Sequence, residues 1–244
     1  MKGIVLAGGL GTRLYPLTKI TNKHLLPVYD RPMIFFPIMK LVESGIKEIM
    51  LVTGGNNAGD FLRLLGDGSQ FGLKRLHYTY QANEGGIAQA IGLCENFVDG
   101  GKMVVMLGDN IIEQNLENVI KEFKADGQGA KIFLKKVANP REYGVVEFKS
   151  NRITRIIEKA QDPPSDYAVI GLYFYDADVF DIIKSLKPSK RKELEITDVN
   201  NIYLKRGKLR YHTLKGGWAD AGESIAAYNK AIDFARQLYK KGKI

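Results

Sequence analysis

Residues 3–14 read GIVLAGGLGTRL, an apolar run that leads into a loop rich in glycine and carrying an arginine. In an open α/β sheet, ligands bind at the carboxyl ends of the strands, which is where this loop would lie. Glycine lets the backbone approach a ligand closely, and successive exposed N–H groups form a concave site for an anion. Arg13 adds a permanently charged, forked donor that suits phosphate. The stretch therefore predicts a phosphate-binding loop after the first strand, although a simple tight turn would explain part of the glycine content.

The loop differs from the two common phosphate-binding signatures. Gly9-Leu10-Gly11 is followed by Thr12-Arg13-Leu14, so the last glycine of the dinucleotide pattern G-x-G-x-x-G is missing. No lysine follows the second glycine, as the pattern G-x-x-x-x-G-K-[ST] requires. Lys23 lies ten residues after Arg13 in a predicted loop, where a lone lysine is usually a solvated surface residue. These residues indicate an anion site of a different kind.

Strand-like and helix-like segments alternate through the first half of the chain, which predicts a mainly parallel sheet covered by helices on both faces. The strand-like runs are 3–7, 48–54, 76–81 and 102–109, and the helical patterns cover 33–42, 60–66, 87–98 and 116–123. After residue 130 the pattern changes to consecutive strands, followed by helices near 176–186 and 196–206, a strand at 209–216 and a closing helix at 222–240. We predict an α/β fold with a Rossmann-like, mixed and mainly parallel sheet and flanking helices. It would be a single domain over 1–244, with a nucleotide-type half at about 1–125 and a substrate-type half at about 126–244.

Composition narrows the function classes. With 244 residues and 45% hydrophobic residues the chain can bury a substantial core, and no apolar run is long enough for a membrane span or a signal peptide. We therefore expect a cytoplasmic protein. The one cysteine, Cys94, lies in an apolar helical pattern and is expected to pack in the core. The net charge of +9 admits nucleic acid, but the basic segments contain no aromatic interleaving and no recognisable nucleic-acid module, so a small anionic ligand is the better match.

Several blocks of the sequence resemble a known family. GIVLAGGLGTRLYPLT at 3–18, followed by NKHLLPV at 22–28 and RPMI at 31–34, is similar to the N-terminal signature of the sugar-1-phosphate nucleotidylyltransferases. The blocks FLRLLGDGSQFG, LGDN, REYGVVEF, YAVIGLYFY and ELEITDVNNIYL narrow the resemblance to members that transfer a thymidylyl group to glucose 1-phosphate. The resemblance implies that a phosphate oxygen of glucose 1-phosphate attacks the α-phosphorus of dTTP, giving dTDP-glucose and pyrophosphate.

The resemblance also assigns a nucleotide site. Arg13 and Lys23 would hold the triphosphate and act as catalytic residues together with Asp109. The amide of Gln81 offers a donor and an acceptor to a base edge, and the backbone of Gly86 would also contact the base. Without the resemblance, Gly85 and Gly86 would be an ordinary helix start. The implied nucleotide-binding set is Leu6, Gly8, Gly9, Gly11, Thr12, Arg13, Lys23, Gln81, Gly86 and Asp109.

A sugar-phosphate site is implied in the second half. Glu158 and the backbone of Gly144 would bind sugar hydroxyls, while Lys159 and Arg191 would hold the phosphate. Without the resemblance, these side chains would be surface charges or strand residues. The implied set is Tyr143, Gly144, Glu158, Lys159, Val169, Tyr173 and Arg191.

Asp109 ends the predicted buried strand VVMLGDN, where a carboxylate either caps a loop or binds a metal. In the resembling family the matching aspartate binds Mg²⁺ together with a late aspartate that matches Asp220. Two carboxylates with phosphate oxygens and water suit the octahedral oxygen coordination of Mg²⁺. Asp220 would also be able to cap the last helix. We expect Mg²⁺ as the cofactor, bound by Asp109 and Asp220.

Other functions stay open on the sequence alone. An enzyme that prefers UTP or another sugar phosphate is the nearest alternative, since dTTP and UTP differ only in a methyl and a 2′-hydroxyl group. A catalytically silent regulatory subunit is a different class, and intact Arg13, Lys23, Asp109 and Asp220 argue against it. We expect dTTP or UTP and glucose 1-phosphate as partners, neither nucleic acid nor membrane binding, a homo-oligomer, and a role in making deoxysugar or polysaccharide precursors.

Overall fold

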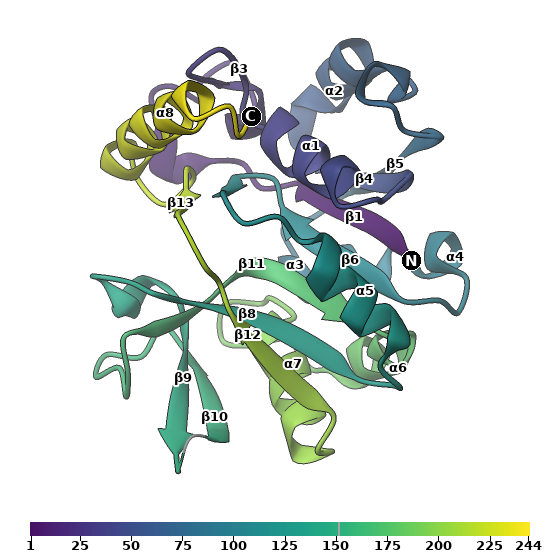
Figure 1. Cartoon of the computed structure of the whole chain (residues 1–244), viewed down its shortest axis with the longest axis vertical. Helices are drawn as coiled ribbons and strands as arrows, with labels where there is room; N and C mark the ends of the chain where they lie inside the picture. Colours follow the sequence, from purple (N-terminus) through teal and green to yellow (C-terminus); the bar gives the residue numbers. More distant parts are fainter. Residues whose placement is uncertain (151) are drawn as a thin grey trace. The chain divides into compact units, whose positions relative to one another are not determined.

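The structure, a computed structural model, describes residues 1–150 and 152–244 (Figure 1). These residues form two compact units. Unit 1 comprises Met1, Gly85–Val105 and Phe123–Leu214, and unit 2 comprises Lys2–Glu84, Met106–Glu122 and Lys215–Ile244. Two elements, β6 (Met103–Leu107) and α5 (Glu117–Ala125), cross the divisions.

Parallel strands form the centre of unit 2. The opening run becomes β1 (Lys2–Ala7), which pairs in parallel with β4 (Glu48–Gly54), and β4 pairs in parallel with β5 (Arg75–Gln81). Residues 3–7 are all buried, because a parallel sheet with helices on both faces leaves no side exposed to water. The helices along this part of the chain are α1 (Phe35–Glu43) and α2 (Ala58–Leu65), with short 3₁₀ turns at Thr12–Leu14, Lys23–Leu25, Gly55–Asn57 and Ser69–Phe71.

Two pairs of short strands lie outside the main sheet, in unit 2. β7 (Asn110–Ile112) pairs antiparallel with β13 (Trp218–Asp220), so that Asp220 lies opposite Asn110. A second pair joins β2 (Pro27–Val28) to β3 (Arg31–Pro32). The final helix α8 (Ile225–Lys240) packs against β13 and β2, as its position beside β13 in Figure 1 shows. Its buried face joins a core that includes Leu14, Val28, Met33 and Ile111.

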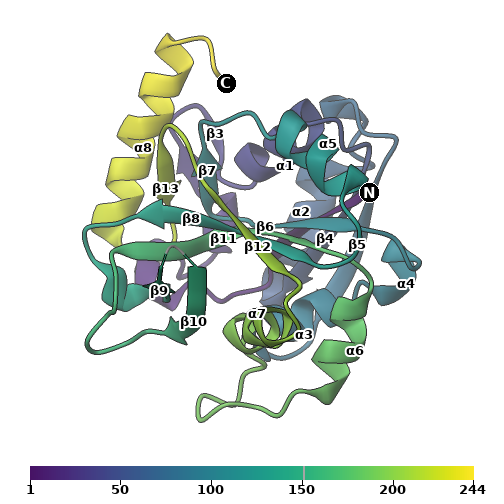
Figure 2. The same ribbon diagram turned by 60° about the horizontal axis from the view of Figure 1, so that its bottom comes forward.

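Antiparallel pairing dominates unit 1. β11 (Tyr167–Tyr175) pairs antiparallel with β8 (Ala130–Lys136) and with β9 (Gly144–Lys149), and β9 forms a hairpin with β10 (Arg152–Glu158). β12 (Leu209–Thr213) lies parallel to β8. The helices are α3 (Gly86–Gly92), α4 (Glu95–Val98), α6 (Asp178–Ser185) and α7 (Ile196–Lys205), with a 3₁₀ turn at Pro140–Glu142. α3, α6 and α7 pack against one another, and Figure 2 shows this group below the strands.

The expected α/β fold, a mixed and mainly parallel sheet with flanking helices, is confirmed. The helix expected at 87–98 is instead two short helices, because Gly92 is a poor helix former and α3 ends there. Cys94 lies between them and is fully buried, as expected, and burial raises the pKa of its thiol to about 12. The division into halves near residue 125 stays a prediction. Among the residues described, no helix is both long and apolar enough to cross a bilayer.

Candidate functional site

The glycine loop and Lys23 lie against each other in unit 2. Gly11 has a positive φ of 70°, and a Cβ there would lie 2.9 Å from the Cβ of Lys23. The Thr18 hydroxyl donates to the Gly11 carbonyl oxygen at 2.9 Å. Only glycine combines this backbone conformation with so close an approach. The loop therefore needs Gly11 in order to stay beside the lysine.

The first part of the loop lies against the end of β5. A Cβ at Gly8 would be 2.7 Å from the Oε1 atom of Gln81, so this glycine and this amide are neighbours. The Leu6 carbonyl oxygen accepts a hydrogen bond from Gly108 N at 2.8 Å, which ties β1 to the residue before Asp109. Leu6, Gly8 and Gln81 thus meet at the carboxyl ends of β1 and β5, where a parallel sheet binds ligands, and Asp109 follows the residue bonded to Leu6.

Asn22, which the sequence analysis did not select, fastens the loop to the lysine turn. Its amide nitrogen donates to the carbonyl oxygens of Ala7 (3.3 Å) and Gly9 (3.5 Å), and its Oδ1 accepts from the backbone N of His24 (2.9 Å). The His24 ring also contacts that oxygen through Nδ1 at 2.8 Å. Burial, followed by the charge of Lys23, lowers the pKa of His24 to about 3, so the imidazole is neutral and Nδ1 carries the proton. Asparagine's preference for capping positions was the one available signal.

Lys23 and Asp109 form a buried ion pair. Nζ of Lys23 lies 2.5 Å from Oδ2 of Asp109, and the two side chains are only 10% and 8% exposed. The other oxygen, Oδ1, accepts from the amide of Asn110 at 3.0 Å, and Trp218 Nε1 in turn donates to that amide's oxygen at 2.7 Å. Burial alone would raise the pKa of Asp109, but the ammonium of Lys23 and these hydrogen bonds hold it well below its usual value. Asp109 is therefore a carboxylate at neutral pH.

Asp220 lies next to this pair. Ala221 N donates to the Asp109 carbonyl oxygen at 2.9 Å, and Gly222 N donates to Oδ1 of Asp220 at 2.9 Å. Burial, and then the negative charge of Asp109, raise the pKa of Asp220 to about 7. The helix-capping alternative is wrong, because the Ser224 side chain caps α8 by accepting from Ala227 N. The turn that ends β13 thus brings a second carboxylate to the first.

These two carboxylates fit a divalent metal. Burial and the charge of Asp109 raise the pKa of Asp220, and Lys23 supplies only one positive charge to the two carboxylates, so a further cation there would be stabilised. Mg²⁺ is commonly held by one or two carboxylates, with substrate phosphates and water completing its shell. Within 1–150 and 152–244 no cluster of three or more His, Cys, Asp and Glu side chains is present, so an all-protein metal cage is not part of the described site.

The open part of the loop faces solvent. Gly9, Thr12 and Arg13 are exposed, and no heavy atom lies within 4 Å of a Cβ built at Gly9. The positive charge of Arg13 acts on Asp220, lowering the carboxyl pKa against the larger effects that raise it. Arg13 is therefore near the carboxylates and is accessible to an anion.

Unit 1 contains all of the predicted sugar-phosphate residues. Glu158 lies opposite Gly144 in the β9–β10 hairpin, and the Thr197 hydroxyl donates to Oε2 of Glu158 at 2.6 Å. A Cβ at Gly144 would stand 3.1 Å from both the Glu158 carboxylate and the Thr197 hydroxyl. The carboxylate is thus held in one orientation, which is what recognition of a sugar hydroxyl requires. Thr197 was not predicted from the sequence.

The expected phosphate-binding cations flank this carboxylate. Arg191 lies 2.7 Å from Glu195 and 3.7 Å from Glu158, and Lys159 N donates to the Tyr143 carbonyl oxygen at 3.0 Å. Lys159 also lines an open hollow of about 490 Å³, together with Arg141. Arg191 reaches the site from a loop 33 residues away in sequence.

Three more of the predicted residues also lie in unit 1. Val169 and Tyr173 are buried in β11, on either side of a register shift in its pairing with β8. Gly86 begins α3, has a φ of 90°, and a Cβ there would lie 2.7 Å from the Leu194 carbonyl oxygen. This glycine belongs to unit 1, whereas Gln81 belongs to unit 2.

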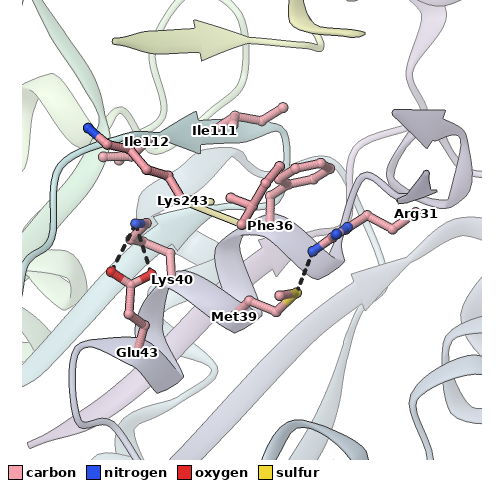
Figure 3. Close-up of a pocket in the computed structure, with 9 residues that line it drawn as sticks. Arg31, Phe36, Met39, Lys40, Glu43, Ile111, Ile112 and Lys243 are labelled. Carbon is pink, nitrogen blue, oxygen red and sulfur yellow. Dashed lines mark hydrogen bonds and ion pairs between the residues drawn. The ribbon is translucent and has the colours of Figure 1, made fainter. Parts of the chain in front are cut away.

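A separate pocket of about 100 Å³ in unit 2 is lined mainly by apolar side chains (Figure 3). Phe36, Ile111 and Ile112 form its apolar wall, and Lys40 donates to Glu43 at 3.0 Å at one side. Since its charges are paired and it contains no glycine loop, it is not the predicted nucleotide site.

Known proteins are similar to this chain in sequence and in fold. The family model described as Nucleotidyl transferase matches residues 2–237. The chain is 47% identical to a glucose-1-phosphate thymidylyltransferase of Neisseria meningitidis serogroup A / serotype 4A over 95% of this chain and 81% of the relative. It is 44% identical to one of Mycobacterium tuberculosis H37Rv, over 99% of this chain and 84% of the relative.

Solved structures agree. A candidate glucose-1-phosphate thymidylyltransferase from Bacillus anthracis, crystallised with a sucrose, superposes with a TM-score of 0.92 and 50% identity, covering 97% of this chain and 95% of that one. A UDP-glucose pyrophosphorylase complexed with UDP-glucose gives a TM-score of 0.83 at 27% identity, covering 98% of both chains. The chain therefore belongs to the nucleotidyl transferase family, and its sequence groups it with the glucose-1-phosphate thymidylyltransferases.

Proposed function

We propose that this chain transfers the thymidylyl group of dTTP to glucose 1-phosphate, giving dTDP-glucose and pyrophosphate. The observation that carries the proposal is the buried Lys23–Asp109 pair, with Asp220 beside it and a glycine loop against it, in a chain 47% identical to a thymidylyltransferase. Both substrates are anions, so an effective site must first offset their repulsion. Cations next to carboxylates that accept a metal provide this.

Different residues of the chain would bind different parts of the two substrates. Lys23 places an ammonium at the α-phosphate, and Arg13 holds the outer phosphates through its forked donors. Gln81, next to Gly8, reads the base edge. Glu158 and Gly144 bind the sugar hydroxyls, while Lys159 and Arg191 hold the sugar phosphate. The attacking oxygen already belongs to a phosphate, so no covalent protein nucleophile is needed and alignment of the two substrates drives the transfer.

Asp109 and Asp220 would hold a divalent cation, which we take to be Mg²⁺. When bound, this ion neutralises charge on the phosphate oxygens in the transition state. The pairing of β7 with β13 keeps the two carboxylates adjacent, so the protein supplies the ligands in place.

A UTP-specific enzyme is the second candidate. The observation that favours it is the likeness to a UDP-glucose pyrophosphorylase over 98% of both chains. The higher identity to thymidylyltransferases favours dTTP.

The deciding experiment measures pyrophosphate release with glucose 1-phosphate and Mg²⁺, using dTTP, UTP, CTP, ATP and GTP in parallel. We expect the highest kcat/KM with dTTP. Asp109→Asn is expected to abolish turnover, while Asp181→Asn, at an exposed helix position, serves as the matched control. A preference for UTP would establish the second candidate, and no release with any nucleotide would reject both. A homo-oligomer in the cytoplasm, supplying deoxysugar or polysaccharide precursors, completes the proposal, and light scattering after size exclusion tests the oligomer.

A further inference from the structure

Lys23 occupies the Asp109 oxygen that a metal would need. Its Nζ lies 2.5 Å from Oδ2, and Oδ1 already accepts from Asn110 at 3.0 Å. Both oxygens of the carboxylate are therefore bonded to protein groups.

The Gly222 backbone packs closely against this ion pair. Lys23 and Asp109 are nearly buried, and a Cβ at Gly222 would lie 2.6 Å from Nζ and 2.2 Å from Oδ2. A divalent cation at Oδ2 would also meet the positive charge of the ammonium at contact distance, which is strongly repulsive in a poorly solvated site. Metal and ammonium thus compete for the same oxygen.

A triphosphate changes this balance. Its oxygens are acceptors of higher charge than one carboxylate, so they draw the ammonium away from Asp109 and at the same time provide further ligands for a metal. If binding of the triphosphate favours binding of the metal, the metal favours binding of the triphosphate to the same extent, because coupling between two ligands is reciprocal.

We propose that Lys23 acts as a built-in cation that fills the place of the metal at Asp109 and releases that place only when a triphosphate binds. This inference rests on the proposed function for the identity of the nucleotide. It means that metal alone binds poorly and that metal and nucleotide bind cooperatively. Lys23 then determines the conditions for metal binding in addition to contacting the α-phosphate.

The test measures Mn²⁺ binding without nucleotide, from the electron paramagnetic resonance signal of free Mn²⁺. Lys23→Met removes the charge at similar length and is expected to lower the Mn²⁺ Kd at least tenfold relative to wild type. Lys19→Met, at an exposed lysine in the same segment, should leave the Kd within twofold. The double variant Lys23→Met, Asp109→Asn should lose this tighter Mn²⁺ binding. That loss would show that the metal binds at Asp109 and not elsewhere on the surface. A Lys23→Met protein that binds Mn²⁺ no better than wild type would overturn the proposal.

Two further measurements keep the test decisive. If neither Lys23→Met nor Lys23→Gln folds, wild type and Asp109→Asn are compared without nucleotide: equal, weak Mn²⁺ binding supports the proposal, and tight binding lost in Asp109→Asn refutes it. Pyrophosphate release by the wild type is scored separately. If the wild type releases pyrophosphate but Lys23→Met does not bind Mn²⁺ more tightly, only the role of Lys23 is rejected. If Lys23→Met binds Mn²⁺ more tightly but the wild type is inactive towards dTTP, only the proposed substrate is rejected.

Discussion

The substitution Gly222→Ala should separate the groups at the centre of the site. The added methyl would lie 2.2 Å from Oδ2 of Asp109 and 2.6 Å from Nζ of Lys23, whereas ordinary contacts begin at 3.4 Å. Both of these buried side chains must therefore move by about 1 Å. The φ of Gly222 is not positive, so alanine is compatible with the backbone and the effect is a local clash.

The expected loss of activity follows from that displacement. A misplacement of about 1 Å in a catalytic group costs about 100-fold in rate, so kcat/KM for pyrophosphate release should fall by about that factor. Overpacking at a buried site should also destabilise the protein by about 1–3 kcal/mol, measured by urea unfolding.

Gly59→Ala is the matched control, because Gly59 lies in α2 with no positive φ and nothing within 4 Å of its Cβ position. This change should keep full activity and stabilise the helix by up to about 1 kcal/mol. Gly222→Ala with wild-type kcat/KM and unfolding free energy would refute the reasoning, since it would mean that the Lys23–Asp109 pair moves at no cost.

Three further substitutions test other parts of the site. Asp220 has a pKa of about 7 in the folded protein against 3.8 in the unfolded chain, so the stability of the wild type falls as the pH rises from about 4 to 7. After discounting for partial hydration, Asp220→Asn should therefore be about 2 kcal/mol more stable than the wild type at pH 8 and little changed at pH 4. Urea unfolding at both pH values measures this. Equal stability of variant and wild type at pH 8 would contradict the buried-carboxylate argument. Asn22→Ala should cost about 1–2 kcal/mol of stability and raise the KM for dTTP more than that for glucose 1-phosphate, because the amide bonds Ala7, Gly9 and the lysine turn. Steady-state kinetics with each substrate varied would contradict this positioning role if the two KM values changed equally or not at all. Arg191→Gln should raise the KM for glucose 1-phosphate about tenfold and leave that for dTTP within twofold, and a change in the dTTP value alone would reject its assignment.

The long periodic segments of this chain were predictable from sequence because local pattern determines them. The buried runs at 3–7 and 48–54 and the closing helix are long enough for periodicity to reveal their type, and they became β1, β4 and α8. The strands β7 and β13 were not predicted, because each has three residues and their pairing joins segments more than 100 residues apart. Local sequence patterns carry no information about contacts between segments so far apart in the chain.

The same limit applies to the candidate site. Gly8, Gly11 and Asp109 were found because glycines after a strand and an acid at a strand end have local meanings. Asn22 and Thr197 were missed, because their roles appear only when the residues they bond, Ala7 for one and Glu158 for the other, are brought near by the fold.

The charges of the side chains at the centre of the site do not balance one another. Asp109 is neutralised by one ammonium, while Asp220 is kept near protonation by burial and by Asp109. On the proposed function, the groups placed to meet the charge of a metal and a triphosphate lack partners beforehand, which is unfavourable for the fold. The unfavourable energy is offset by structure around the site: the β7–β13 pairing, the Asn22 amide and the packing under α8. Binding of metal with nucleotide should then stabilise the fold as well as prepare the reaction, because ligands that bind only the folded state shift the unfolding equilibrium.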